Sequence, residues 1–428
     1  MSDSVAELRA RIQKLSSEIE LQKKLLTKLE HDKFLAQRQL NAVLDPVARL
    51  PLEISSEIFL RCLPPLPALN LPASGTRRRP HPLPILLLNI CNAWTTIALS
   101  IPDLWTAIDI IFPCAEGFQE VLQTWLQRAR NRPLSISFRG DLYGRSAVAG
   151  IIWQHGRQLR NLEICADTED EEGDKVIDLF GGAIPGPLPM LETLAIRGLI
   201  DMQEFHGSQI LQLLRLAPNV VECIIHGVSP VWYIALQSQM PVLSNLRRLL
   251  FGPCTESPKS DDDLLKRLSL PTLETLSVSL RYVSSDKLFS FLERSSPPLQ
   301  ELVVGGGHEP RDSFRLQECL RLLPSLTRFK VWFPDSDFAP ILFTALVDSS
   351  FLPNLRNLTI HNLTQLHIPE SSWGTLLRAL SARRTQLQAV RLELRDGPPP
   401  VDMALFRELV DGGMQIYIGT EELNFIVA

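Results

Sequence analysis

The sequence predicts an α/β fold: an irregular solenoid of helix-turn-strand units with a parallel inner sheet, preceded by a small helical domain and an N-terminal coiled-coil helix. Three observations predict it. The first 45 residues carry apolar heptads, leucine makes up 74 of the 428 residues, and one spaced apolar motif recurs nine times beyond residue 130. Such repeated units bury their apolar sides only by stacking on their neighbours. We therefore expect domains at residues 1–45, 46–112 and 113–428.

The composition is that of a globular chain and excludes several classes of function. Hydrophobic residues make up 45% and charged residues 21%, so disorder over most of the length is not expected. With 43 basic and 48 acidic residues, the net charge of -5 argues against a nucleic-acid partner. An uncharged stretch at 81–102 is interrupted by Pro, Asn and Thr, so no membrane span is expected. The seven cysteines never form a C-x-x-C pair, which fits a reducing compartment, cytoplasmic and/or nuclear.

Residues 5–43 form more than five heptads without Pro or Gly, and their only polar a and d positions are Lys33 and Gln22. The pattern predicts a helix that ends at Asp45, because the residue before a proline avoids the α region. Two arrangements stay open. One is a homodimer through residues 5–43, in which isoleucine at a and leucine at d favour a parallel coiled coil, and the other is an amphipathic helix that folds back on its own chain. The a positions are Val5, Ile12, Ile19, Leu26, Lys33 and Leu40, and the d positions are Leu8, Leu15, Gln22, Leu29, Ala36 and Val43.

Two short amphipathic helices are predicted within residues 46–112. In the segment 50–63, Pro51 suits a first helical turn, and apolar residues recur every three or four positions. Apolar residues keep the same period from Leu86 to Ala98. A proline-rich insertion, 64–84, favours extended backbone without internal hydrogen bonds, and its simplest role is that of a spacer.

These segments resemble the F-box-like domain at the front of large protein families of mushroom-forming fungi (basidiomycetes). The resemblance rests on the L-P-x-E-I start at Leu50, the Cys91-x-x-Trp94 pair and the closing Pro102-x-Leu104-Trp105. It implies docking to the Skp-type adaptor of a cullin-RING ubiquitin ligase. The adaptor-binding residues that it implies are Leu50, Pro51, Ile54, Ile58, Phe59, Leu63, Ile90, Trp94 and Ile97.

The motif L-x-x-L-x-(apolar) begins every 26 to 32 residues, near the long end of the leucine-rich-repeat range. Most of the stretches before the motifs keep a helical period, so each unit is predicted to be helix, turn, strand. Segments 134–138 and 415–418 are predicted to be strands that begin and close the array. The nine motifs begin at Leu159, Leu191, Val220, Leu246, Leu273, Leu299, Leu326, Leu355 and Leu387.

The later strands of this array hold a candidate binding surface. Period-two alternation turns the Leu-type positions to the core and the intervening residues to the concave face. Several cations then surround one exposed tryptophan, a set that could accept an acidic or phosphorylated peptide. The alternative is a group of ordinary solvated charges with the tryptophan covered by a loop. The substrate-binding candidates are Arg328, Lys330, Trp332, His361 and Arg391.

Catalytic and metal-binding motifs are missing from the sequence, which has no P-loop, H-E-x-x-H or C-x-x-C. We therefore expect neither an enzyme nor a bound metal or cofactor. The predicted function is that of a substrate-recognition subunit of a Skp/cullin/RING ubiquitin ligase, with the adaptor and cullin scaffold on the F-box side and an unknown protein target on the repeats. The alternative is a non-catalytic repeat scaffold or sensor with no ubiquitin role. The two differ in whether the helix within 50–63 is exposed or buried.

Overall fold

The protein is α/β and forms two compact units in the computed structural model. The structure describes residues 2–47, 50–63, 83–140, 146–166, 177–198, 205–226, 228–229, 240–251, 262–279, 283–305, 310–334, 337–361, 368–394, 399–420 and 423–426. A helical unit comprises the described residues of 1–66, 76–106 and 124–132, and a sheet unit comprises the described part of the rest. Among the described residues, no helix is both long and apolar enough to cross a bilayer.

The helical unit has an aromatic core. Phe59 and Trp94 pack with their ring centroids 4.9 Å apart, and the buried Trp105 meets Trp125 edge to face at the same separation. The indole Nε1 of Trp105 donates to the carbonyl of Ala98 at 3.0 Å, so this buried donor is satisfied. The elements of the unit are α1 (Ser2–Leu44), α2 (Leu52–Arg61), α3 (Leu83–Ile90), α4 (Asn92–Ser100), the 3-10 turn η2 (Pro102–Trp105) and the second half of α5 (Phe118–Ala129).

The sheet unit contains one parallel sheet whose twelve strands follow chain order. Each of the nine repeated motifs supplies one strand, and the segments predicted to open and close the array supply β2 and β14. The strands are β1 (Ala107–Phe112), β2 (Leu134–Gly140), β3 (Leu159–Ala166), β4 (Thr193–Arg197), β6 (Glu222–His226), β8 (Arg248–Phe251), β9 (Thr275–Ser279), β10 (Glu301–Gly305), β11 (Arg328–Trp332), β12 (Asn357–His361), β13 (Ala389–Glu393) and β14 (Gln415–Gly419). A separate parallel pair joins β5 (Phe205–His206) to β7 (Val228–Ser229).

The register of the sheet follows the leucine spacing. The second apolar position of each motif lies opposite the same position in the neighbouring strands, as Leu276, Leu302 and Phe329 do. These side chains are at most 1% exposed. Burying one such side chain stabilises the fold by about 1.5–3 kcal/mol, so a slip of register would move a whole row of apolar groups out of the core.

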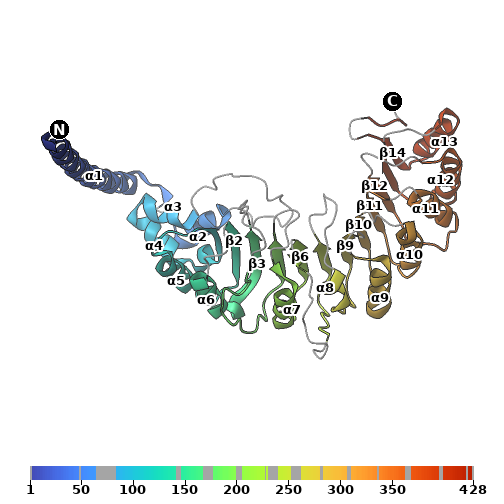
Figure 1. Cartoon of the computed structure of the whole chain (residues 1–428), viewed down its shortest axis with the longest axis horizontal. Coiled ribbons are helices and arrows are strands. Elements are labelled where there is room, and N and C mark those ends of the chain that lie inside the picture. The colour runs from blue at the N-terminus through green and yellow to red at the C-terminus, as the bar shows by residue number, and fades with distance from the viewer. Residues whose placement is uncertain are drawn as a thin grey trace. The chain divides into compact units, whose positions relative to one another are not determined.

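Helices run along one side of this sheet (Figure 1), as the helix-turn-strand pattern predicts. Their apolar sides supply the other half of the core, in which residues such as Leu213, Leu288 and Leu376 are fully buried. The helices are α6 (Ser146–Gln154), α7 (Gly207–Leu216), α8 (Asp262–Lys266), α9 (Ser285–Ser295), α10 (Pro310–Arg321), α11 (Phe338–Val347), α12 (Glu370–Ala382) and α13 (Pro400–Asp411), with the short 3-10 turn η3 (Gly156–Gln158) after α6.

The structure differs from the expected domain boundary at residue 112. Ala107–Phe112 forms the edge strand β1 and pairs in parallel with β2, so the sheet unit begins before the expected boundary at 113. The segment 124–132, in contrast, belongs to the helical unit. Most of the proline-rich insertion, 64–82, lies outside the described residues.

Candidate functional site

The helix α2 presents an apolar row to solvent. The row consists of Ile54 and Ile58, together with Leu50 just before the helix, and their exposed fractions are 50%, 37% and 40%. Leu52, at the start of the helix, is 50% exposed but points away from this row. The opposite side of the helix is fixed in the core, because Ser55 is fully buried and donates to the carbonyl of Val47 at 3.3 Å. A short helix with one side anchored and an apolar row uncovered is a candidate docking surface.

Phe59 is not part of that surface, which corrects the sequence-based expectation. Its side chain is 1% exposed and packs on the ring of Trp94. The physical reason is helical geometry: Ile58 and Phe59 are successive residues and point about 100° apart, so Phe59 turns to the side that Ser55 anchors while Ile58 faces solvent. Of the other predicted docking residues, Pro51 is exposed, and those in an intermediate state of burial are Leu63, Ile90, Trp94 and Ile97.

The second candidate surface is the face of the sheet that alternation turns away from the helices. On β11, Arg328 is exposed, Lys330 and Trp332 are half-buried, and the residues between them are buried, as predicted. Cross-strand pairing places Trp332 beside His361, and His361 beside Glu393. The five predicted binding residues therefore gather on β11, β12 and β13, over three adjacent strands.

Stacking and hydrogen bonds hold this group together. The rings of Trp332 and His361 stack, with centroids 4.0 Å apart and planes 14° from parallel. The Nζ of Lys330 lies 4.3 Å from the centroid of the Trp332 ring, in a cation–π contact. His361 Nδ1 bonds to one oxygen of Glu393, and Arg391 Nε donates to the other at 2.7 Å. We call Lys330, Trp332, His361, Arg391 and Glu393 the Trp332 cluster.

The ionisation of the cluster follows from its burial. Burial lowers the pKa of His361, and the hydrogen bond to Glu393 only partly offsets this effect. For Glu393, burial raises the pKa, but the hydrogen bonds from His361 and Arg391 outweigh burial and leave the pKa below its usual value. At neutral pH the pair is therefore a neutral imidazole that donates to an ionised carboxylate.

The cluster is less open and less cationic than the sequence predicted. Trp332 is half-buried rather than an exposed aromatic, because its ring lies between neighbouring side chains of the cluster. His361 is 8% exposed. Glutamates pair with two of the cations, Arg328 with Glu301 at 2.8 Å and Arg391 with Glu393. These residues form a preorganised polar surface of mixed charge, with little excess of positive charge.

Polar side chains at the start of the same strands extend this surface. They line a groove of about 630 Å³ that reaches Arg328 and Asn357. Its members include Gln300, Thr327, Arg356 and Gln388, all of which immediately precede a strand. The groove and the Trp332 cluster thus share β11 to β13 and offer both charged and amide groups to a ligand.

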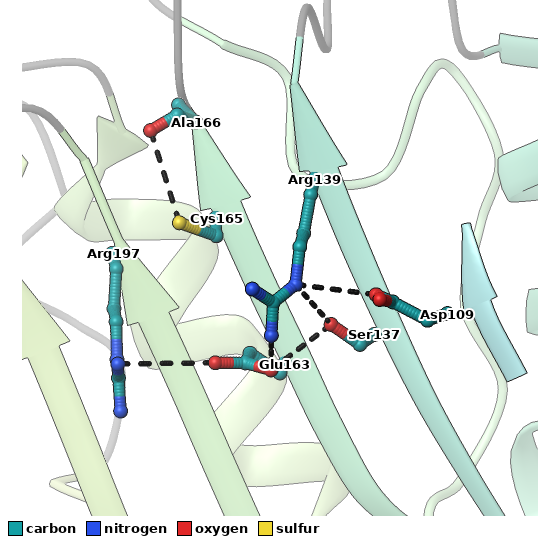
Figure 2. Close-up of polar contacts among 7 residues, drawn as sticks. All are labelled: Asp109, Ser137, Arg139, Glu163, Cys165, Ala166 and Arg197. Atoms are coloured by element: carbon teal, nitrogen blue, oxygen red, sulfur yellow. Dashed lines mark hydrogen bonds and ion pairs between the residues drawn. The ribbon is translucent and has the colours of Figure 1, made fainter. Parts of the chain in front are cut away.

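An ion-pair network that the sequence analysis missed lies on β1 to β4 (Figure 2). Arg139 contacts Asp109 and Glu163, each at 3.2 Å, and Glu163 also contacts Arg197 at 3.9 Å. Ser137 donates to Glu163 at 2.9 Å. The signal in the sequence is polar residues at alternate positions in the strands. The cross-strand register brings Asp109, Ser137 and Glu163 into one row and Arg139 and Arg197 into the next row on the same face.

The middle of this face is apolar. Ala195, Ile224 and Leu250 form a buried cluster on β4, β6 and β8, at 0%, 3% and 0% exposure. Their register places them in the row that holds Lys330 on β11. The face therefore has a polar network at one end, an apolar middle and the Trp332 cluster at the other end.

A scan against protein-family models finds no family that matches the chain, and no curated protein matches it either.

Proposed function

We propose that the chain is a substrate receptor of a Skp/cullin/RING ubiquitin ligase, with an F-box-like helical unit and a leucine-rich-repeat-like sheet unit. The observation that carries the proposal is the exposure of Ile54 and Ile58 on α2 and of Leu50 just before it, while Ser55 and Phe59 fix the other side of the helix. A helix that merely capped the repeats would bury this row. Its exposure supports docking of the helix on an apolar groove of the adaptor.

Adaptor capture tests this proposal. The full-length protein should co-purify with a Skp-type adaptor, and Ile54→Asp with Ile58→Asp should abolish capture, because a docked interface leaves the new carboxylates unpaired. Both positions are exposed, so circular dichroism should stay unchanged. A matched control is Leu405→Asp with Val347→Asp, two sheet-unit positions that are 46% and 41% exposed. Equal adaptor recovery with both double variants, or none with the native chain, would favour the repeat scaffold instead.

The protein target is proposed to bind the sheet face of β11 to β13. The Trp332 cluster offers an aromatic ring, a cation and fixed hydrogen-bonding groups, the side-chain types that anchor interfaces. The indole Nε1 of Trp332 is buried and lacks a hydrogen-bond partner within the described part of the chain. An unused buried donor costs free energy, and a ligand that reached this corner of the sheet would satisfy it.

Charge reversal tests the target surface. Arg328→Glu with Lys330→Glu should weaken target capture and leave adaptor capture unchanged. Arg247→Glu is the matched control, because Arg247 is exposed and pairs with Glu274 at 2.8 Å, the same separation as Arg328 and Glu301. Undiminished recovery of ubiquitinated targets with the double reversal would place recognition elsewhere.

A further inference from the structure

The heptad face of α1 is uncovered from Leu8 to Val43. From residue 7 to residue 44, every residue is exposed except Arg38 and Asn41. At the a positions, Ile12, Ile19 and Leu26 are 62%, 55% and 57% exposed. The nine apolar a and d residues from Leu8 to Val43 form one row on a continuous helix and a large area of unburied hydrophobic surface, which indicates a docking face.

The chain holds α1 by the opposite side of the helix. Arg38 donates to Asn92 Oδ1 at 2.9 Å and to Thr95 Oγ1 at 3.0 Å, and Asn41 donates to the carbonyl of Ile90 at 3.0 Å. Arg38 and Asn41 occupy the f and b positions of the heptad, which point away from the a and d row. The helix therefore does not fold back through its apolar face, and within the described residues that face has no cover.

The two polar residues of the row, Gln22 and Lys33, indicate that its partner is a second copy of α1 in an antiparallel register. A parallel, in-register pair would bring Lys33 against Lys33 of the second copy in the core, which is repulsive. One antiparallel register instead places Gln22 opposite Lys33 of the second copy at two symmetric layers. Sliding this register by one heptad places Lys33 opposite Leu15 or Leu29. In the register that places Gln22 opposite Lys33, the remaining layers are all apolar. They pair Leu26 with Leu29, Ile19 with Ala36, Leu15 with Leu40 and Ile12 with Val43.

Charges beside the row agree with the same register. In an antiparallel pair, e positions face e positions along one flank, and here Lys23 faces Glu30 of the second copy at two symmetric places. We propose that α1 pairs with α1 of a second copy as an antiparallel two-stranded coiled coil in which Gln22 faces Lys33. This proposal does not depend on a role in ubiquitin transfer. At 1.5 Å per residue it places the two Leu44 residues about 50 Å apart.

A charge substitution separates the two orientations. Gln22→Glu adds an ion pair with Lys33 at both symmetric layers of the antiparallel dimer but juxtaposes two glutamates in a parallel one. Sedimentation equilibrium of the full-length protein should give a dimer whose Kd falls about tenfold with Gln22→Glu. Ser17→Glu, at an exposed f position, is the control and should leave the Kd unchanged. A rise in Kd with Gln22→Glu, or a native chain that is monomeric at micromolar concentration, would overturn the proposal.

Disulfide trapping gives a second, independent readout. Ile12→Cys alone should form no cross-linked dimer, whereas an equal mixture of Ile12→Cys and Val43→Cys chains should, because these positions share a layer only in the antiparallel register. The unsubstituted chain, oxidised under the same conditions, shows how much cross-linking comes from the native cysteines. Efficient cross-linking of Ile12→Cys alone would show a parallel dimer and contradict the proposal.

Discussion

The carboxylate of Asp45, one residue beyond α1, accepts a hydrogen bond from the indole Nε1 of Trp94 in α4. The same carboxylate receives the backbone N–H of Val47 at 2.9 Å and the thiol of Cys91 at 3.9 Å. The helix ends before Asp45 because the proline that follows this residue disfavours its α conformation. The Asp45 carboxylate then holds the end of the helix against the aromatic core. One side chain thus anchors the end of the heptad helix to α4 of the same unit.

Asp45→Ala should therefore loosen the helical unit by roughly 1–3 kcal/mol, because it leaves the partly buried indole N–H unpaired. Asp45→Asn keeps one acceptor oxygen and should cost less. Hydrogen exchange of amides in α3 and α4 of the full-length protein measures the change. Asp103→Asn removes an exposed partner of Arg132 in the same unit and is the control. Unchanged protection in Asp45→Ala would show that the hydrogen bond carries little free energy.

Removing one charge from the network on β1 to β4 should lower the free energy of unfolding more than breaking an ordinary surface ion pair does. Glu163 has a side chain that is 12% exposed and contacts Arg139, Ser137 and Arg197. Glu163→Gln should lower the free energy of unfolding by roughly 1–3 kcal/mol, because two guanidinium groups lose their partly buried counter-charge. Urea unfolding, read by hydrogen exchange in β2 to β4, measures the loss.

The matched control for Glu163 is Glu192→Gln. Glu192 pairs with Arg160 at 2.9 Å, but both side chains are about half exposed, so the cost should be at most about 0.5 kcal/mol. Equal losses for the two substitutions would show that burial of the network adds nothing.

The strands were predictable from the sequence because the leucine spacing within each motif also determines which residues lie opposite one another in the sheet. Each motif needs its first and second apolar residues buried, so Leu299 and Leu302 mark β10 without any knowledge of its neighbours. The edge strand β1 was missed because its sequence, A-I-D-I-I-F, lies outside the repeat, at the end of the segment 46–112 that was assigned to the helical domain.

The candidate sites were predictable only where one strand or one helix determines them. Alternation along β11 placed Lys330 and Trp332 on the correct face. The glutamate that neutralises this surface, Glu393, lies more than sixty residues away from Lys330 and joins it only through the order of the strands. The same holds for Glu163 with Arg139 and Arg197, whose meeting depends on register across three strands.

The Trp332 cluster predicts a loss of stability as the pH falls. The folded protein depresses the pKa of His361 below 6.5, so between that depressed value and about 6.5 the unfolded chain binds more protons than the folded one. The stabilisation is complete above about pH 6.5 and is lost as the pH falls below it. Glu393, whose pKa is also lowered, loses its contribution only below its ordinary value of 4.5.

Unfolding by urea at pH 7.5 and pH 5.5 tests this linkage. The native chain should be less stable at pH 5.5, and His361→Gln should reduce the difference, since glutamine does not titrate. Burial also lowers the pKa of His155, and His155→Gln measures the share of the pH dependence that comes from this second histidine. Identical pH dependence in the native chain and His361→Gln would show that His361 does not titrate with folding.

The last prediction concerns Arg383, an arginine that is 1% exposed. Its guanidinium donates to four backbone carbonyls, one in the last turn of α11 and three between α11 and β12: to Leu346 at 2.7 Å, to Leu352 at 3.0 Å, and to Asp348 and Phe351. Leu352 has a φ of 50°, a left-handed conformation that is strained for a branched side chain, so this segment needs outside support. Burial lowers the pKa of Arg383, but the carbonyls use its fixed fork of donors, which a lysine cannot reproduce.

Arg383→Met should keep the packing of the stem yet leave the buried carbonyls without donors. The expected loss is roughly 3 kcal/mol or more of unfolding free energy, with hydrogen exchange first rising in α11, α12 and β12. Arg383→Lys should fall between Arg383→Met and the native chain. Arg384→Met, at the exposed neighbouring position, should change stability by less than about 0.5 kcal/mol. If Arg383→Met were as stable as Arg384→Met, the four carbonyls would have to find other donors, and Arg383 would not anchor this segment.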